Sequence, residues 1–153
     1  MAKTLNGEID YVQEIKDAWG WVGIEPIEIL YINRFGNLII RDERDRFWRL
    51  CPEDSYCEIV AANPAELEHL KEDKEFMIDW AMGALVDLAE QSVGKLAEGQ
   101  CYCLALPSVV GGTYDVANLA SAPLHELIRS SGSLAEQIKD LPDGAAIKIK
   151  ITD

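Results

Sequence analysis

Four short apolar runs decide the fold, and they occupy residues 27–32 (IEILYI), 38–41 (LIIR), 46–50 (RFWRL) and 57–60 (CEIV). Polar residues separate the runs, with the sequence NRFGN in the first gap and DERD in the second. β-Branched and aromatic residues favour strands, whereas Asn, Asp and Gly favour the turns between them. The four runs therefore predict an antiparallel meander.

Helical patterns lie on both sides of the meander in the sequence. Apolar residues recur every three or four positions from Leu5 to Trp19, which predicts a first helix. Asn63 and Pro64 predict the start of a second helix, because Asn caps helices, Pro is favoured at the first helical position and Glu66 completes a capping box. Further helices are expected over residues 73–96 and 123–141, the second with a possible break at Gly132.

Two more strands are expected in the C-terminal half. One covers residues 101–106 and ends at Pro107, and the other covers residues 147–151, where isoleucines alternate with lysines. Strands in one run with helices around them predict the α+β class. The expected fold is an antiparallel sheet, made of the N-terminal meander plus C-terminal strands, packed with about four helices.

Length and composition indicate one domain spanning residues 1–153, in which residues 1–18 contain the first helix. The chain has 153 residues, 48% of them hydrophobic, which suffices for its own core. Its opening residues are polar and lack the apolar segment of a secretory signal. No stretch reaches the ~18 consecutive apolar residues of a membrane span. We therefore expect a cytoplasmic protein with no membrane partner.

Acidic residues outnumber basic ones, at 27 Asp and Glu against 14 Lys and Arg, and the net charge is −13. This balance argues against direct binding to nucleic acid or anionic lipid, because both ligands require neutralising Lys and Arg. Residues 50–100 hold 12 of the acids and only 3 bases. An acidic run in this segment predicts a docking surface for a basic protein, the alternative being a face that only maintains solubility. The run consists of Glu66, Glu68, Glu72, Asp73, Glu75 and Asp79.

Cysteine and histidine, which supply many metal ligands and catalytic bases, are few in this chain. The cysteines fall into two pairs, Cys51-x5-Cys57 and Cys101-x-Cys103. Neither spacing is that of a zinc knuckle, so we expect buried free thiols and neither metal nor cofactor. His69 and His125 belong to no metalloprotease motif, and the sequence contains no Gly-x-Ser-x-Gly nucleophile elbow. A protein that is not an enzyme is the expectation.

A pair of glycines marks one further loop, formed by Gly111, Gly112, Thr113, Tyr114 and Asp115. Paired glycines can bring backbone amides close to an anion, as in phosphate-binding loops. This segment lacks the lysine and the further glycine of a P-loop. A tight turn that requires positive φ is the preferred interpretation.

Several stretches of the chain are similar to a known family, and they are residues 99–119 (GQCYCLALPSVVGGTYDVANL), 124–128 (LHELI) and 137–144 (QIKDLPDG), with 35–37 (FGN) and 47–50 (FWRL) upstream. The resemblance is to the C-terminal domain of the Tdi-type immunity proteins of bacterial type VI secretion. It covers residues 19–153, and its most specific piece is Gly-Gly-x-Tyr-Asp-x-x-Asn, which begins at Gly111. None of these stretches is a catalytic motif.

The resemblance implies a cytoplasmic antitoxin that binds and blocks a cognate effector, and the effector that it implies is a nuclease. Many members carry an additional N-terminal domain resembling the GAD domain, for which this chain is too short. A nuclease presents positive charge to bind phosphate, and an acidic protein can occupy that surface. We therefore expect an immunity protein whose partner is a basic nuclease.

Two alternatives remain open from the residues. One is a non-enzymatic regulatory or scaffolding module with the same fold and no toxin partner. The other is a small enzyme that uses Cys101, Cys103 or His125, although no set of nucleophile, base and orienting residue is visible in the sequence.

Overall fold

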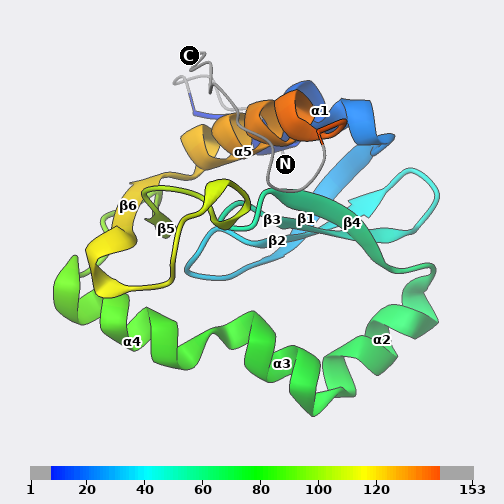
Figure 1. The fold of residues 1–153 in the computed structure, drawn as a ribbon. Coiled ribbons are helices and arrows are strands. Elements are labelled where there is room, and N and C mark those ends of the chain that lie inside the picture. Colours follow the sequence, from blue (N-terminus) through cyan, green and yellow to red (C-terminus); the bar gives the residue numbers. More distant parts are fainter. Residues whose placement is uncertain (1–7, 142–153) are drawn as a thin grey trace.

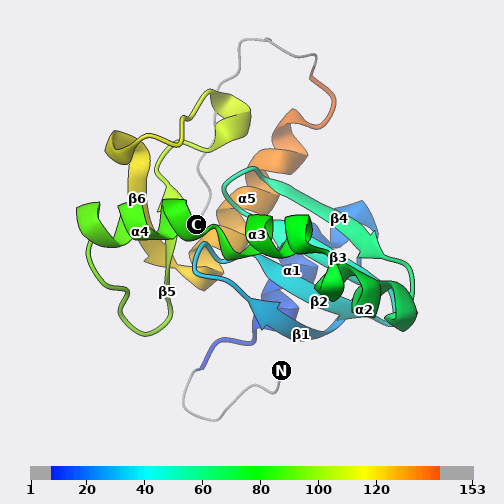
Figure 2. The same ribbon diagram turned by 90° about the horizontal axis from the view of Figure 1, so that it is seen from below.

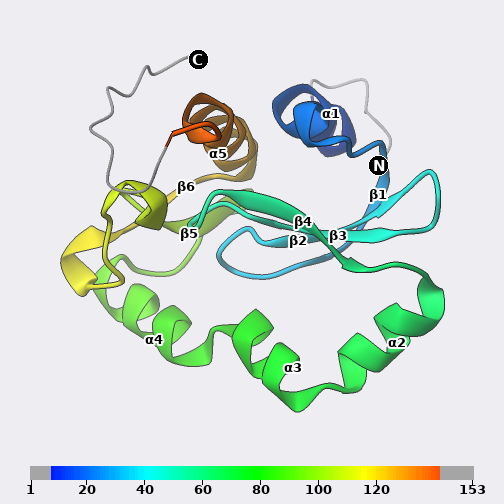
Figure 3. The same ribbon diagram turned by 45° about the vertical axis from the view of Figure 1, so that its right-hand side comes forward.

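A computed structural model describes residues 8–141, and in this range the chain forms three layers (Figures 1 and 3). The central layer is a four-stranded sheet with a two-stranded sheet beside it. Helices α1 and α5 cover one side, and helices α2, α3 and α4 run in an arc along the other. The α+β class predicted from the sequence is confirmed.

The central sheet is the expected antiparallel meander, in the order β1-β2-β3-β4. Its strands are β1 (Pro26–Ile32), β2 (Leu38–Asp42), β3 (Phe47–Cys51) and β4 (Tyr56–Ala61). The Asn33 side chain accepts hydrogen bonds from the amides of Phe35 (3.0 Å) and Asn37 (2.9 Å), which shapes the first turn. Helices cover both faces, so β2 and β3 are buried along most of their length and lack a polar–apolar alternation.

Helices α1 (Tyr11–Trp19) and α5 (Leu124–Ile138) lie side by side on the first face of the sheet (Figure 1). A short 3-10 helix, η1 (Gly20–Val22), follows α1. Helix α1 begins later than Leu5, because Asp10 caps its N-terminus by accepting a hydrogen bond from the Gln13 amide at 3.1 Å. Ile15 and Ile128 are fully buried between the helices and the sheet.

The predicted break at Gly132 is wrong, since α5 continues through it. A Cβ at this position would lie 2.4 Å from the carbonyl oxygen of Ala18 in α1. The glycine is therefore explained by the close approach of two helices, which a sequence cannot reveal, rather than by a helix end.

The arc on the second face consists of α2 (Pro64–Glu72), α3 (Lys74–Ala81) and α4 (Gly83–Ser92), seen from below in Figure 2. The single helix expected over residues 73–96 is instead two helices. Met82 lies between them with φ of 51°, a left-handed conformation that interrupts a helix. The expected start of α2 is confirmed, because Asn63 caps it and Pro64 is its first residue.

The expectation that C-terminal strands extend the meander is wrong for the described residues, because β5 and β6 form a second sheet of their own. Strand β5 (Gln100–Leu104) pairs with β6 (Leu119–Pro123), which the sequence analysis missed, and β5 ends two residues earlier than predicted. The amide of Tyr102 donates to the carbonyl of Arg34 at 2.8 Å and joins this sheet to the first turn of the meander. The strand expected at residues 147–151 lies outside the described residues.

Candidate interaction surface

The acidic residues singled out from the sequence all lie on the helical arc, which we define as α2, α3 and α4. Glu66, Glu68 and Glu72 belong to α2, Asp73 precedes α3, and Glu75 and Asp79 belong to α3. All six are exposed. Residues 64–98 contain nine Asp or Glu and three Lys, so negative charge prevails along the arc.

Of the six carboxylates in the acidic run, two that lie in α2 have local structural partners. Glu66 accepts a hydrogen bond from the amide of Ala62 at 2.8 Å, while its own amide donates to Asn63 Oδ1 at 2.9 Å. The cap at Asn63 is confirmed, but the predicted capping box is not reciprocal, because Glu66 accepts from the amide of Ala62, one residue before the cap, and not from that of Asn63. Glu68 pairs with Lys71 at 2.6 Å, one turn further along the same helix. Both carboxylates are therefore engaged within the helix that carries them.

Two more of the carboxylates hold α3 in place. Asp73 caps α3 by accepting from the amides of Glu75 (3.0 Å) and Phe76 (3.2 Å). Asp79 accepts from the guanidinium of Arg49 at 2.6 Å, and Arg49 is buried on the sheet beneath. Asp73 and Asp79 therefore have structural roles, and their presence on the arc does not require a binding partner.

Glu72 and Glu75 differ from the other four. Within residues 8–141, neither carboxylate forms an ion pair or a side-chain hydrogen bond, and both are exposed. They are the two members of the run whose charge no local contact within this range accounts for. They are therefore the carboxylates in the run best suited to contact a partner.

A buried polar network connects α3 to the sheet through Arg49. Arg49 Nε donates to Asn37 Oδ1 at 3.0 Å, and Asn37 Nδ2 donates to Glu53 Oε1 at 2.8 Å. The guanidinium also lies 5.8 Å from the ring centroid of Phe76 and 5.3 Å from that of Trp80. One arginine therefore fastens α3 by charge and by stacking on two aromatic rings.

The loop of Gly111, Gly112, Thr113, Tyr114 and Asp115 is tied to the turn between β3 and β4. The Tyr114 hydroxyl donates to the carboxylate of Asp54, and the Ser108 hydroxyl donates to the same carboxylate at 2.5 Å. Two short 3-10 helices, η2 (Ser108–Val110) and η3 (Val116–Asn118), flank the loop. The loop is anchored by side chains that belong to its specific sequence pattern.

The glycines and the asparagine of this pattern also have structural roles. Gly111 has φ of 95°, the positive value expected for it. A Cβ on Gly112 would lie 1.6 Å from the carbonyl oxygen of Leu106, so no larger residue fits. Asn118 Nδ2 donates to the carbonyls of Leu106 (2.9 Å) and Thr113 (2.8 Å) and closes the loop. The arrangement explains the pattern without any ligand.

Three potential metal ligands, on Cys51, Glu53 and Asp54, lie within 4.8 Å of one another. Hydrogen bonds already occupy both carboxylates. Asp54 accepts from the hydroxyls of Ser108 and Tyr114, and Glu53 accepts from the side-chain amide of Asn37. Burial raises the pKa of both the Cys51 thiol and the Glu53 carboxyl, which favours the protonated forms. The donor set fits a polar network better than a cation site.

All four cysteines are free and buried, as expected. Burial raises the pKa of Cys57 to about 12 and those of Cys101 and Cys103 to about 11. Such thiols are protonated at neutral pH and are poor nucleophiles.

The two histidines lie on opposite sides of the sheet, with His69 in α2 and His125 in α5.

A cavity of about 370 Å³, which the sequence did not predict, opens near η1 and the β2–β3 turn. Asp42 lies in its wall and accepts from the side chains of Arg46 and Trp48, both at 2.8 Å, and from the amides of Arg44 and Arg46, both at 2.9 Å. These bonds satisfy the buried carboxylate and lower its pKa despite the opposing effect of burial. Asp42 is thereby explained as a turn residue.

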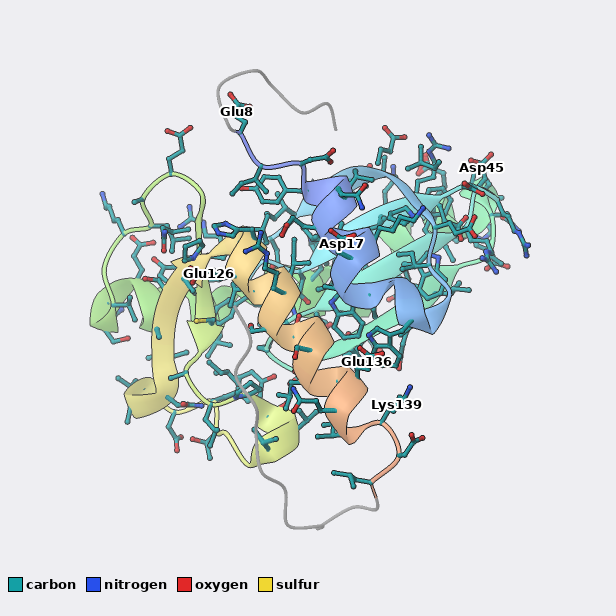
Figure 4. The ribbon with its side chains drawn as sticks, turned by 90° about the horizontal axis from the view of Figure 1, so that it is seen from above. Glu8, Asp17, Asp45, Glu126, Glu136 and Lys139 are labelled. Carbon is teal, nitrogen blue, oxygen red and sulfur yellow. The ribbon has the colours of Figure 1, made fainter. Side chains whose placement is uncertain are left out.

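The face of α1 and α5 also carries acidic side chains, and Figure 4 shows Asp17 on α1 and Glu126 and Glu136 on α5 pointing outward. Here basic residues compensate part of the charge. Arg129 pairs with Glu14 across the two helices at 2.5 Å, and Lys139 Nζ lies 5.3 Å from the ring centroid of Trp21. The charge imbalance is therefore greater on the arc than on this face.

Comparison with known families bears on residues 61–135, which match the family described as T6SS immunity protein Tdi1, C-terminal. The matched segment runs from the end of β4 through the arc and the second sheet into α5. The resemblance inferred from the sequence is confirmed over this segment, which is shorter than the expected range of residues 19–153. No curated protein matches the chain. Among residues 8–141, no helix is long and apolar enough to cross a membrane.

Proposed function

We propose that this chain, whose residues 61–135 belong to the Tdi1 C-terminal family of type VI secretion immunity proteins, binds and neutralises a nuclease effector in the cytoplasm. The observation that carries the proposal is the coincidence of two features in one segment. The family match contains the whole helical arc, and the same segment, with 11 acids against 4 bases, carries −7 of the net charge of −13. The function is inhibition by binding and involves no catalysis.

The chemistry of nuclease inhibition supports this assignment. A nuclease must present Lys and Arg to the phosphates of its substrate, and an acidic protein can cover the same groups. Attraction between opposite potentials accelerates encounter and disfavours partners of the wrong charge. Glu72 and Glu75 provide charge for this purpose without local ion pairs among residues 8–141.

The test is co-expression with the product of the neighbouring gene, followed by purification of the complex and a toxicity assay. The proposal predicts a stable complex and survival of cells that produce both proteins. A neighbouring product that neither binds the chain nor harms cells in its absence would contradict it.

Association kinetics then test which face binds. We expect Glu72→Lys with Glu75→Lys to lower the association rate constant by about 10-fold at low salt and to weaken its salt dependence. The matched control is Glu126→Lys with Glu136→Lys, the same change of charge on α5 (Figure 4). Equal effects of the two pairs would mean that net charge alone matters and that the arc is not the binding face.

A further inference from the structure

Helix α3 is unusual in that none of its residues is buried. Its inner side consists of Phe76 and Trp80, which are half-buried against Arg49 and the apolar face of the sheet. Two aromatic residues suffice to seat a helix of two turns. The remaining apolar residues of α3 are therefore not required for its packing.

The outer side of α3 is charged in its first turn, where Lys74 and Glu75 lie, and apolar in its second turn. At 100° per residue, Ile78 lies almost opposite the midpoint of Phe76 and Trp80, and its side chain is 73% exposed. The exposed Ala81 adjoins Ile78 at a spacing of one turn, and Met77, 39% exposed, adjoins Ala81 on the flank of the helix. Single exposed apolar residues are normal, but here three of them form one strip.

Helix α5 provides the comparison within the same chain. Its exposed residues are all polar or charged, and they are Glu126, Arg129, Ser130, Glu136 and Gln137. The chain therefore does place polar residues on a helix face that no other element within residues 8–141 covers. The apolar outer strip of α3 departs from this pattern.

The strip is held rigidly in spite of its exposure. The Asn33 side chain donates to the carbonyl of Trp80 at 2.8 Å, close to the C-terminal end of α3. Asp73 caps the other end, and Asp79 pairs with Arg49. Because these contacts fix the helix before a partner arrives, little ordering entropy is lost on binding.

We propose that Met77, Ile78 and Ala81 form the apolar centre of the partner interface, with Glu72 and Glu75 at its rim. The partner is a basic protein surface with an apolar depression that receives Ile78. Charge complementarity selects this occupant, because a second copy of the chain or an anionic membrane would bring negative charge against an arc with nine acids and three lysines in residues 64–98. The inference rests on the proposed function and adds to it the source of affinity.

The apolar strip and the charged rim should affect different rate constants of binding. Burial of a large side chain at the centre of an interface slows dissociation, whereas rim charges act mainly on association. Ile78→Gln removes the apolar side chain without adding charge, and glutamine is a good helix former. The matched control is Ile59→Gln, since Ile59 is 44% exposed on β4 and pairs with Trp48 on the opposite face of the sheet.

The experiment measures dissociation of each variant from the neighbouring gene's nuclease, inactivated by substitution of a catalytic residue. We expect Ile78→Gln to weaken the complex at least about 30-fold, mostly through faster dissociation, and Ile59→Gln to leave it unchanged. Circular dichroism and thermal unfolding verify that both variants are folded.

Three outcomes overturn the proposal. If the wild-type chain binds the nuclease and Ile78→Gln binds equally well, the strip is not part of the interface, while the proposed function stands. If the wild-type chain forms no complex, the proposed function fails and the inference with it. If sedimentation shows a wild-type dimer that Ile78→Gln dissociates, the strip joins two copies of the chain instead.

Discussion

The two helical layers of this protein differ in how they use their apolar residues. Helices α1 and α5 direct theirs into the core, where Ile15 and Ile128 are fully buried. The arc buries only Leu67 in α2 and Ala89 in α4, and α3 buries none. Helices α1 and α5 therefore stabilise the sheet by burying apolar side chains. The arc is held against the sheet by a few polar and aromatic contacts, and its outer side stays available.

The largest expected effect contrasts one isoleucine from each layer. Ile128→Ala should lower the free energy of unfolding by about 2–5 kcal/mol, because it leaves a cavity in the core. Ile78→Ala should change it by no more than about 0.5 kcal/mol, because the side chain is already in solvent. Urea denaturation followed by tryptophan fluorescence measures both, and similar losses would show that α3 packs as tightly as α5.

The next effect concerns the attachment of α3 to the sheet. Arg49→Met should lower the free energy of unfolding by about 2–4 kcal/mol. It removes the bond to Asp79 and leaves the buried side-chain oxygen of Asn37 without its donor. Amide hydrogen exchange should accelerate in α3 more than in α5. Arg41→Met is the control, because its pairs with Glu28 and Asp45 are more exposed and should contribute much less to stability.

A smaller effect is expected from the loss of a helix cap in each layer. Asp73→Ala and Asp10→Ala should each cost about 1 kcal/mol. Exchange of the α3 amides should nevertheless increase more than that of the α1 amides, because Ile15 and Trp19 hold α1 in the core. Equal increases in α1 and α3 would mean that burial does not separate the layers.

The smallest effect is a pH dependence at the junction between the arc and the sheet. Burial raises the pKa of Glu53, so the folded state binds a proton more tightly than the unfolded chain. This contribution is fully present below the unfolded pKa, near 4.5, and is lost as the pH rises through the folded pKa. Glu53→Gln should therefore flatten the decline of stability with pH above 4.5, measured by denaturation at a series of pH values. An unchanged slope would show that Glu53 titrates normally.

The contribution of Asp42 to stability changes with pH in the opposite direction, and it does so in a separate pH range. Its hydrogen bonds lower its pKa, so its contribution is present above the unfolded value of about 3.8 and is lost as the pH falls further. The two carboxyl groups can be distinguished because their windows lie on different sides of pH 4.

Local patterns predicted the meander, the helix cap at Asn63 and the class of the fold. Each depends on residues close together in the chain, such as the turn-forming Asn33 and the pair Asn63 and Glu66. The split at Met82 escaped prediction although Gly83 follows it, because the residue in the left-handed conformation is a methionine, which rarely adopts positive φ. Strand β6 escaped because its residues, LASAP, have weak strand propensity and pair only with a partner brought close by the loop.

The sequence by itself determined the excess of negative charge, its concentration in residues 50–100 and the similarity of residues 61–135 to the Tdi1 C-terminal family. These are properties of composition and order, and folding does not alter them. Only the tertiary structure decided which carboxylates are committed to caps and to Arg49, and which apolar residues of α3 point outward. The physical reason is that a side chain's partners and exposure depend on what the rest of the chain places beside it.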